Sequence, residues 1–330
     1  MSRNWQKLGL VYTAPGTGLR RSHAMLPTPH VMADRIRVYI ASCDADQRGR
    51  IFRVDLDRND PLRIIDAPEE PVLDLGPDGS FDTHGVNPSQ IVERNGAQLL
   101  YYIGWERISA DVPYTLFAAL SESHDDGLSF TKRGTGQVLR GAGTERYFRT
   151  APFVFPERHG WGMLYIGGGE FFDGAAAKRL PVYSLCLTHS LDGLVWDQTP
   201  SSPLLVPVRQ DREIGFGRPV LWHEDGQASL IISLRTESGY SLRQAVMQGN
   251  TLVWSALFDG ETVDEWESQM TCFGAPCRAG DWEYLFYNGN QFGRSGFGVA
   301  RRRMQAEAKV GSTEALIDAL RRANRLTCPR

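Results

Sequence analysis

The chain has 330 residues, of which 42% are hydrophobic, with 34 glycines and 18 prolines. The formal net charge of −3 gives no basic footprint, so we expect no nucleic-acid partner. No stretch approaches the roughly 20 apolar residues that span a bilayer, and the first residues lack an apolar signal core, so we expect a cytoplasmic protein without a membrane partner.

The cysteines are odd in number and scattered, which is typical of reduced thiols in a cytoplasm. They are Cys43, Cys186, Cys272, Cys277 and Cys328. Cys272 and Cys277 lie close together, but no second pair of cysteines or histidines accompanies them. We therefore expect no structural zinc site.

After a predicted strand at residues 5–12, a segment of short strands returns five times. Each copy enters through a proline and continues into an apolar middle strand, which is often rich in tyrosine. The prolines are Pro27, Pro88, Pro152, Pro219 and Pro276, spaced by 61, 64, 67 and 57 residues, and the middle strands lie at 38–42, 100–104, 164–168, 230–234 and 285–289. A repeat of this size made of strands and turns predicts the blades of a propeller.

Each predicted blade has a third strand, at 49–54, 114–119, 182–187, 240–245 and 296–300. Residues 5–12 would add the outer strand of the last blade, so that the ring has no free edge. The predicted fold is an all-β, five-bladed propeller over residues 1–304, closed by this N-terminal strand. Residues 305–330 form a predicted helical tail, with a short helix over 312–320 that begins at Ser312 or Thr313.

A second repeat closes the blades. Asp126-Gly127 and Asp192-Gly193 form predicted turns, which are followed by the aromatic residues Phe130 and Trp196. Asp-Gly pairs readily adopt positive φ, and the aromatic ring would pack between blades. We expect these turns to be structural.

The inner strands of a propeller line a central channel, so polar residues at strand entries and strand ends converge on one mouth. At the entries these are His23, Asp82, His84, Arg149, Arg218 and Glu267, and at the ends Asp44, Trp105, Glu106, Glu170, Arg235, Asn288 and Asn290. Polar groups beside tryptophans and tyrosines predict a pocket for a sugar.

The entry at 22–24, the stretch 79–89 and the segment 286–298 resemble bacterial proteins related to five-bladed glycosidases. That superfamily includes arabinanases, β-xylosidases, invertases, levansucrases and mannoside phosphorylases. Within it, the chain is similar to glycosidase-like proteins of bacterial surface-polysaccharide gene clusters. The resemblance covers residues 5–303 and implies glycosyl hydrolysis or transfer by carboxylates at the channel mouth.

In such enzymes one carboxylate acts as base or nucleophile and another as acid. The resemblance implies these roles for Asp82 together with Glu267 or Glu170. The chain departs from the family at His23, where a hydrolase would have an aspartate, and at Arg149, which is followed by threonine rather than aspartate.

His23 and His84 lie on inner strands of adjacent predicted blades. Their imidazoles could transfer protons near neutral pH or orient a substrate hydroxyl, and we include both among the catalytic candidates. We predict no cofactor, and a metal held by His23, Asp82 and His84 is the alternative. A neutral histidine with internal hydrogen bonds is the structural alternative for each.

Arg149 and Arg218 would each need a carboxylate partner or an anionic ligand inside a channel. An anionic ligand would carry a phosphate, nucleotide or acidic-sugar group. Pairing with Asp82 or Glu267 is the structural alternative.

The sequence thus predicts a carbohydrate-active enzyme that acts on a small or anionic sugar, or a nucleotide sugar, of polysaccharide or glycoconjugate biosynthesis. Substrate-binding roles are assigned to Asp44, Arg149, Arg218, Trp105, Glu106, Arg235, Asn288 and Asn290. Alternatives are a non-catalytic propeller that binds a glycan or protein partner, and different chemistry built on His23, Asp82 and His84. Two carboxylates within about 10 Å across the pocket would favour hydrolysis, whereas arginines and histidines would favour anion binding or other chemistry.

Overall fold

The computed structural model describes residues 5–174, 178–208, 212–224, 227–249, 251–258, 263–304 and 312–327. Most of its regular elements are β-strands, which confirms the predicted all-β class. None of the helices in these residues combines the length and apolar character needed to cross a membrane.

Antiparallel pairing groups most of the described strands into five successive sets, which we call units and number in chain order. Short parallel pairings join the first three units into one 11-stranded sheet. The first contains β2 (Ser22–Val31), β3 (Arg35–Cys43), β4 (Gly49–Asp57) and β5 (Ile64–Asp66), and the second β6 (Gly85–Arg94), β7 (Ala97–Arg107), β8 (Tyr114–Ser123) and β9 (Thr131–Gln137). The third contains β10 (Phe148–Glu157), β11 (Gly160–Gly168) and β14 (Ser184–Ser190), and the fourth β15 (Glu213–Glu224), β16 (Gln227–Thr236), β17 (Tyr240–Gln248) and β18 (Thr251–Ala256). The fifth contains β19 (Cys272–Ala279), β20 (Trp282–Asn288), β21 (Phe297–Arg303) and β1 (Gln6–Tyr12).

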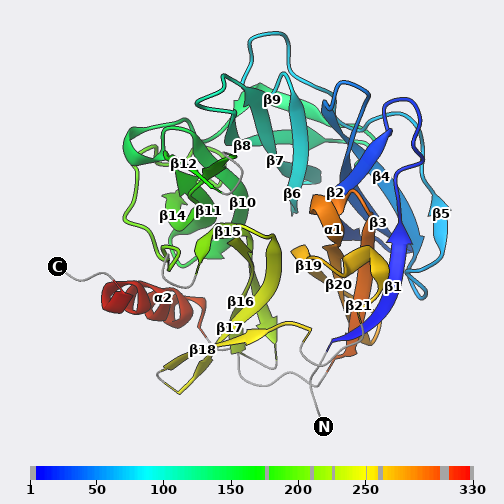
Figure 1. The fold of residues 1–330 in the computed structure, drawn as a ribbon. Helices are drawn as coiled ribbons and strands as arrows, with labels where there is room; N and C mark the ends of the chain where they lie inside the picture. The colour runs from blue at the N-terminus through cyan, green and yellow to red at the C-terminus, as the bar shows by residue number, and fades with distance from the viewer. Residues whose placement is uncertain are drawn as a thin grey trace.

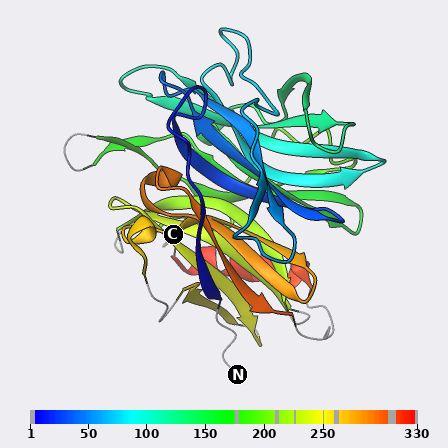
Figure 2. The ribbon, with the colours of Figure 1, turned by 90° about the vertical axis from the view of Figure 1, so that its right-hand side faces the viewer.

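Figure 1 shows the five units arranged around a common centre, with β2, β6, β10, β15 and β19 on the inside. A hairpin of β12 (Phe171–Asp173) and β13 (Arg179–Pro181) leaves the third unit between β11 and β14. Figure 2 shows this hairpin in green, projecting to one side of the molecule. Three short helical turns lie between strands. The turn η1 (Gly143–Glu145) precedes β10, η4 (Glu265–Glu267) precedes β19, and α1 (Asn290–Gly293) follows β20.

The N-terminal strand joins the fifth unit. β1 pairs antiparallel with β21, which confirms that residues 5–12 add a strand to the last unit. Lys7 of β1 also forms an ion pair with Glu267 (Nζ to Oε1, 2.9 Å), and both side chains are buried. The two ends of the repeat are therefore joined by backbone hydrogen bonds and by one buried charge pair.

The predicted C-terminal helix is present as α2 (Thr313–Thr327). Ser312 is its N-cap, since its hydroxyl accepts hydrogen bonds from the backbone N–H groups of Glu314 and Ala315. Leu316, Ile317 and Leu320 are buried where the helix packs on the fourth unit.

Tyrosines of the middle strands connect neighbouring units at the Asp-Gly turns. The Tyr39 hydroxyl donates to the carbonyl of Gly127 (3.1 Å), and the Tyr101 hydroxyl donates to the carbonyl of Gly193. The aromatic residues after the turns lie against the same tyrosines: Phe130 is 5.4 Å from Tyr39 and Trp196 is 6.4 Å from Tyr101, between ring centroids. The turns therefore have the predicted structural role, with their aromatic rings between units.

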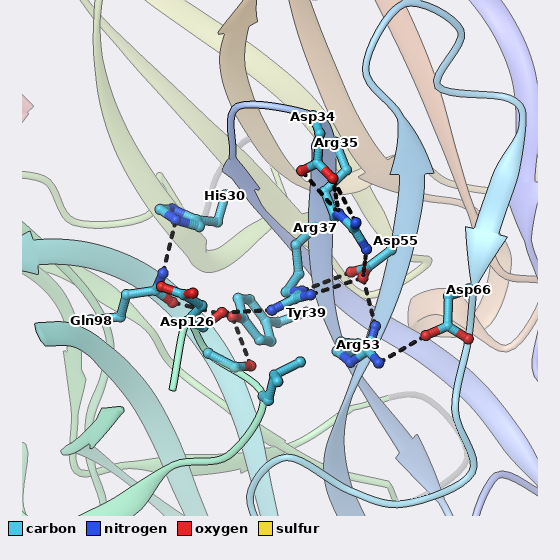
Figure 3. Close-up of polar contacts among 12 residues, drawn as sticks. His30, Asp34, Arg35, Arg37, Tyr39, Arg53, Asp55, Asp66, Gln98 and Asp126 are labelled. Carbon is cyan, nitrogen blue, oxygen red and sulfur yellow. Dashed lines mark hydrogen bonds and ion pairs between the residues drawn. The ribbon is translucent and has the colours of Figure 1, made fainter. Parts of the chain in front are cut away.

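A buried ion-pair network around Asp55 lies beside the contact of Tyr39 with Gly127, which connects the first and second units (Figure 3). Asp55 accepts from Arg37 at 2.7 and 2.9 Å, from Arg53 at 2.6 Å and from Arg35 at 3.1 Å. Burial would raise the pKa of Asp55, but its bonds to Arg37 and the other arginines hold the pKa below the ordinary value. Arg37 in turn donates to the carbonyl of Asp126 (2.6 Å) in the neighbouring unit.

Asp55→Ala should lower the free energy of unfolding by about 3 kcal/mol, because it leaves the buried Arg37 guanidinium without its counter-charge. Urea-induced unfolding measures this change. Asp34→Ala is the matched control, since Asp34 is the exposed partner of Arg35 and its loss should change stability little. Equal stabilities of the two variants would contradict a structural role for the Asp55 network.

Candidate functional site

Four inner strands carry a bulge in which a residue other than glycine adopts the left-handed conformation. These residues are Leu26 (φ 53°), Ala151 (φ 52°), Arg218 (φ 42°) and Phe273 (φ 57°), and the strand register shifts at each of them. Such conformations cost on the order of 1–3 kcal/mol each and cluster at functional sites. The bulges therefore indicate a functional site at the centre of the molecule.

All four bulged residues line one central cavity of about 470 Å³, a volume typical of small-molecule sites. Its cations are Lys178, Arg179, Arg218 and Arg235, its aromatic residues are Trp105, Tyr114, Tyr183, Tyr240, Phe273 and Phe292, and its neutral polar residues include His23, Gln47, Asn87 and Thr150. Among the described residues, no aspartate or glutamate lines this cavity.

Arg218 is buried at the base of the bulge in β15, with 3% of its surface exposed. Its guanidinium donates to the carbonyls of Pro27 (2.8 Å), Ser89 (3.1 Å) and Phe273 (3.2 Å) and to the Thr28 hydroxyl (2.7 Å). Burial lowers the pKa of Arg218 to about 9, so the group is still a cation at neutral pH. Within the described part of the chain it forms no ion pair, which leaves its charge without a carboxylate counter-charge.

Arg235 of β16 adds a second buried cation. Its guanidinium lies over the rings of Tyr183 and Tyr240, 5.3 and 5.5 Å from their centroids. The Tyr183 hydroxyl is hydrogen-bonded to the Tyr114 hydroxyl at 3.0 Å. A guanidinium stacked on rings keeps its N–H groups in its own plane, where they can bind an oxyanion.

His23 and Phe292 approach the cavity on left-handed backbone, with φ of 66° and 60°. The Ser42 hydroxyl donates to the carbonyl of His23 (2.6 Å), and the ring Nδ1 lies 2.9 Å from the Ser22 hydroxyl. Burial, together with the charge of Arg294, lowers the pKa of His23 below 6.5. His23 is therefore neutral at pH 7 and gains a charge only in acid.

The three carboxylates predicted as catalytic lie outside the cavity lining. Asp82 is 1% exposed, accepts from Ser80 (2.8 Å) and Tyr102 (3.0 Å), and pairs with Lys132 at 2.7 Å. Glu267 is buried against Lys7, and Glu170 is exposed. The structure thus gives Asp82 and Glu267 internal partners, and their catalytic roles stay predictions.

Arg149 and His84 also have internal partners. Arg149 is fully buried and pairs with Glu145 at 2.8 Å. Its carboxylate partner is therefore Glu145, and not Asp82 or Glu267 as the structural alternative proposed. His84 accepts a hydrogen bond from the backbone N–H of Arg107 at 3.3 Å. The described residues contain no cluster of three histidine, cysteine or acidic side chains that could hold a metal, so a metal on His23, Asp82 and His84 gains no support.

Among the residues predicted to bind substrate, Arg218, Arg235 and Trp105 line the cavity, and the others do not. Asp44 pairs with Arg50 (2.7 Å), and Glu106 lies partly buried at the end of β7. Asn288 accepts from the backbone N–H of Leu26 and donates to the carbonyl of Ala24, both at 2.7 Å. Asn290 accepts from the backbone N–H of Gln269 (2.7 Å). Both asparagines hold backbone in place.

Sequence reasoning missed several residues that line the cavity, including Asn87, Thr150, Tyr183 and Phe292. Asn87 stands directly before Pro88, as Arg218 does before Pro219, so its position in the repeat was an available signal. Phe292 had no such signal, because its orientation depends on the left-handed backbone of α1. Cys43 also lines the cavity, where burial raises the pKa of its thiol to about 11 and keeps it protonated.

Comparison of the structure with solved structures finds the same fold in carbohydrate-active proteins. A protein described as a glycoside hydrolase matches 92% of this chain and 93% of its own, with a TM-score of 0.66 and 15% identity. A second solved structure comes from work on the GH130 family of mannoside phosphorylases, a family described as containing glycoside hydrolases that target β-1,2 mannosidic linkages in Candida mannan. The match covers 94% of this chain and 96% of that chain, with a TM-score of 0.63 and 15% identity. The β-1,2-mannobiose phosphorylase of Listeria innocua matches 86% and 90%, with a TM-score of 0.59 and 11% identity.

Sequence comparison finds relatives of similar length. The uncharacterized proteins Rv1502 and MT1551 of Mycobacterium tuberculosis are each 27% identical to this chain over 304 residues, covering 90% of it and 98% of their own length. No family model matches the chain. The chain thus shares its fold with glycoside hydrolases and mannoside phosphorylases.

His23→Asn should reduce the loss of stability in acid. The unfolded chain binds a proton on this histidine near pH 6.5, whereas the folded protein binds it only at lower pH, so His23 destabilises the fold as pH falls through this window. Asparagine suits the left-handed backbone.

Urea-induced unfolding at about pH 7.5 and pH 5 measures the effect. The wild type should lose more free energy of unfolding between the two pH values than the variant. The pKa values of His30 and His223 are also lowered, but both residues are present in both proteins, so the difference isolates His23. Equal losses would show that His23 is not the buried neutral group described above.

Proposed function

We propose that the protein is a five-bladed β-propeller whose central cavity binds a carbohydrate that carries an anionic group. The five antiparallel units and the strand that joins the last to the N-terminus support the propeller. The likeness to glycoside hydrolases and mannoside phosphorylases supports a sugar as ligand.

One observation carries the proposal: the cavity is lined by cations and aromatic rings, and by no carboxylate among the described residues. Arg218 and Arg235 are both buried and form no ion pair within those residues, so an oxyanion in the cavity would provide their missing counter-charge. Such a ligand would add the negative charge that the hydrogen bonds of Arg218 to carbonyls and the contacts of Arg235 with tyrosine rings do not supply.

The aromatic lining supports a sugar rather than a free inorganic anion. Trp105, Tyr183 and Phe292 offer flat apolar surfaces beside polar groups, an arrangement that suits a ring with one apolar face and hydroxyls on its edge. Two-carboxylate hydrolysis would need a pair of acidic groups beside such a ring. The cavity lining offers none in the described residues, which favours binding of the anion as the primary role of the site.

An anionic sugar should stabilise the protein more than its neutral counterpart. We expect glucuronate, glucose 1-phosphate or UDP-glucose to raise the melting temperature, and glucose to raise it less, since binding stabilises the folded state by mass action. Arg235→Met should weaken binding of the best ligand about tenfold or more, because a hydrogen bond to a charged group contributes about 1.5–3 kcal/mol.

Thermal melting and titration calorimetry test this prediction. Arg303→Met is the control, since Arg303 is an exposed arginine that does not line the cavity. Circular dichroism checks that both variants fold. Equal effects of glucose and glucuronate, or unchanged affinity in Arg235→Met, would contradict an anionic ligand.

Glycosyl hydrolysis or transfer is the second candidate, and the fold shared with glycoside hydrolases and mannoside phosphorylases favours it. It would use Asp82 with Glu267 or Glu170, as the sequence predicts. Asp82→Asn should then lower turnover of the cleaved glycoside at least a hundredfold, which is the low end of general acid–base contributions.

A panel of nitrophenyl glycosides and glycosyl phosphates tests this candidate, with exposed Asp34→Asn as control. Full activity in Asp82→Asn would remove Asp82 from the mechanism. A cytoplasmic location and a role in polysaccharide or glycoconjugate biosynthesis stay predictions of the sequence.

A further inference from the structure

Four buried polar side-chain atoms of cavity-lining residues lack a hydrogen-bond partner within the described part of the chain. Two are the Nε atoms of the cations Arg179 and Arg218, and the two uncharged ones are the oxygens Asn87 Oδ1 and Thr150 Oγ1. The cost of leaving a buried polar group unpaired is about 1–3 kcal/mol, and the large majority of such groups in native proteins are paired. These two atoms belong to the same cavity and neither had a predicted role. Their shared position points to a ligand that pairs with both.

The two residues lie on adjacent inner strands. The Ser89 hydroxyl of β6 donates to the carbonyl of Pro152 in β10 at 2.8 Å, two residues beyond Asn87 and Thr150 respectively. Further along, the Gln90 side chain exchanges hydrogen bonds with the backbone of Val154 at 3.0 and 2.6 Å. These bonds fix β6 beside β10, so Asn87 and Thr150 enter the cavity from the same side.

The second unit contributes no charged residue to the cavity lining. The lining residues of the second unit are Asn87, Ile103, Trp105, Tyr114 and Leu116, and none is charged. The buried cations enter from other strands, Arg218 from β15 and Arg235 from β16. Lys178 and Arg179 come from the hairpin of the third unit, so the part of the lining that the second unit supplies is uncharged.

A glycine leaves room for the Trp105 ring in the same cavity lining as Asn87. A Cβ atom on Gly49 would lie 3.5 Å from Asn87 Oδ1, and one on Gly85 would overlap the Trp105 ring. Glycine at position 85 leaves room for the Trp105 indole, whereas a Cβ atom on Gly49 would make only an ordinary van der Waals contact with Asn87 Oδ1. An amide oxygen beside an aromatic face matches a sugar hydroxyl beside its apolar ring face.

We propose that Asn87 and Thr150 form a hydroxyl-binding subsite, in which a sugar ring donates one hydroxyl to Asn87 Oδ1 and exchanges a hydrogen bond with Thr150 Oγ1. This subsite rests on the proposed function, since the anionic group of the same sugar would lie toward Arg235. The ligand class is then a monosaccharide unit with free hydroxyls on one edge of its ring and an oxyanion at the other.

Asn87→Leu and Thr150→Val test the subsite, because each keeps the approximate shape of the side chain and removes its hydrogen-bonding atoms. The probes are glucuronate, glucose 1-phosphate and inorganic phosphate, which has no sugar hydroxyl. We expect each variant to bind both sugars about three- to tenfold more weakly and to bind inorganic phosphate as the wild type does, as loss of one neutral hydrogen bond implies. Without ligand, each variant should be at least as stable as the wild type, because an unpaired buried group has been removed.

Thr131→Val, at an exposed position on β9, is the matched control. It should change neither the affinity for the sugars nor the stability without ligand. Unchanged sugar affinity in both cavity variants, with weakened affinity in Arg235→Met, would overturn the subsite and leave the proposed function standing. A marked loss of stability without ligand would show that the two side chains serve the scaffold and would also overturn it. If the wild type binds neither sugar, the proposed function fails and the subsite fails with it.

Discussion

The buried guanidinium of Arg218 joins four of the five antiparallel units. It extends from the fourth unit and donates to backbone carbonyls of Pro27, Ser89 and Phe273, which belong to the first, second and fifth. Two of these carbonyls lie at the bulges, since Pro27 follows Leu26 and Phe273 is itself a bulge residue, and left-handed residues break the regular ladder so that backbone groups need other partners. A planar group with five N–H donors can satisfy several such carbonyls at once, whereas a lysine could not span them.

The same interaction determines the electrostatics of the cavity. Carbonyl oxygens pair with the N–H groups of Arg218 but do not neutralise its charge, and no carboxylate of the described residues does so. The positive charge therefore stays at the cavity wall as a by-product of holding the strands together. Arg235 strengthens it with a guanidinium stacked on tyrosine rings. Scaffold and ligand preference thus depend on one requirement, the pairing of the carbonyls at the bulges.

The sequence predicted the repeat well because the features that define it are local. A proline and an apolar middle strand mark each unit directly, and Asp-Gly turns mark two of them. The pairing of β1 with β21 follows from the need to cover an edge. The carboxylates were harder to place because their partners come from elsewhere in the chain. Asp82 meets Lys132 of β9, and Glu267 meets Lys7, 260 residues away. Position in the repeat indicated depth, but it did not indicate whether a charge would be paired internally.

Pairing is also what separates scaffold from candidate site. Asn288 and Asn87 are both asparagines at the centre of the molecule, yet Asn288 bonds to backbone of β2 while the Oδ1 of Asn87 has no partner in the described residues. Arg149 and Arg218 differ in the same way, since Glu145 neutralises only the first. Residue type is the same within each pair, so residue type could not distinguish them. The hydrogen bonds and ion pairs of each side chain distinguish them. Within the described residues, Asn87 and Thr150 each have a buried oxygen without a hydrogen-bond partner, and Arg218 and Arg235 have no carboxylate counter-charge.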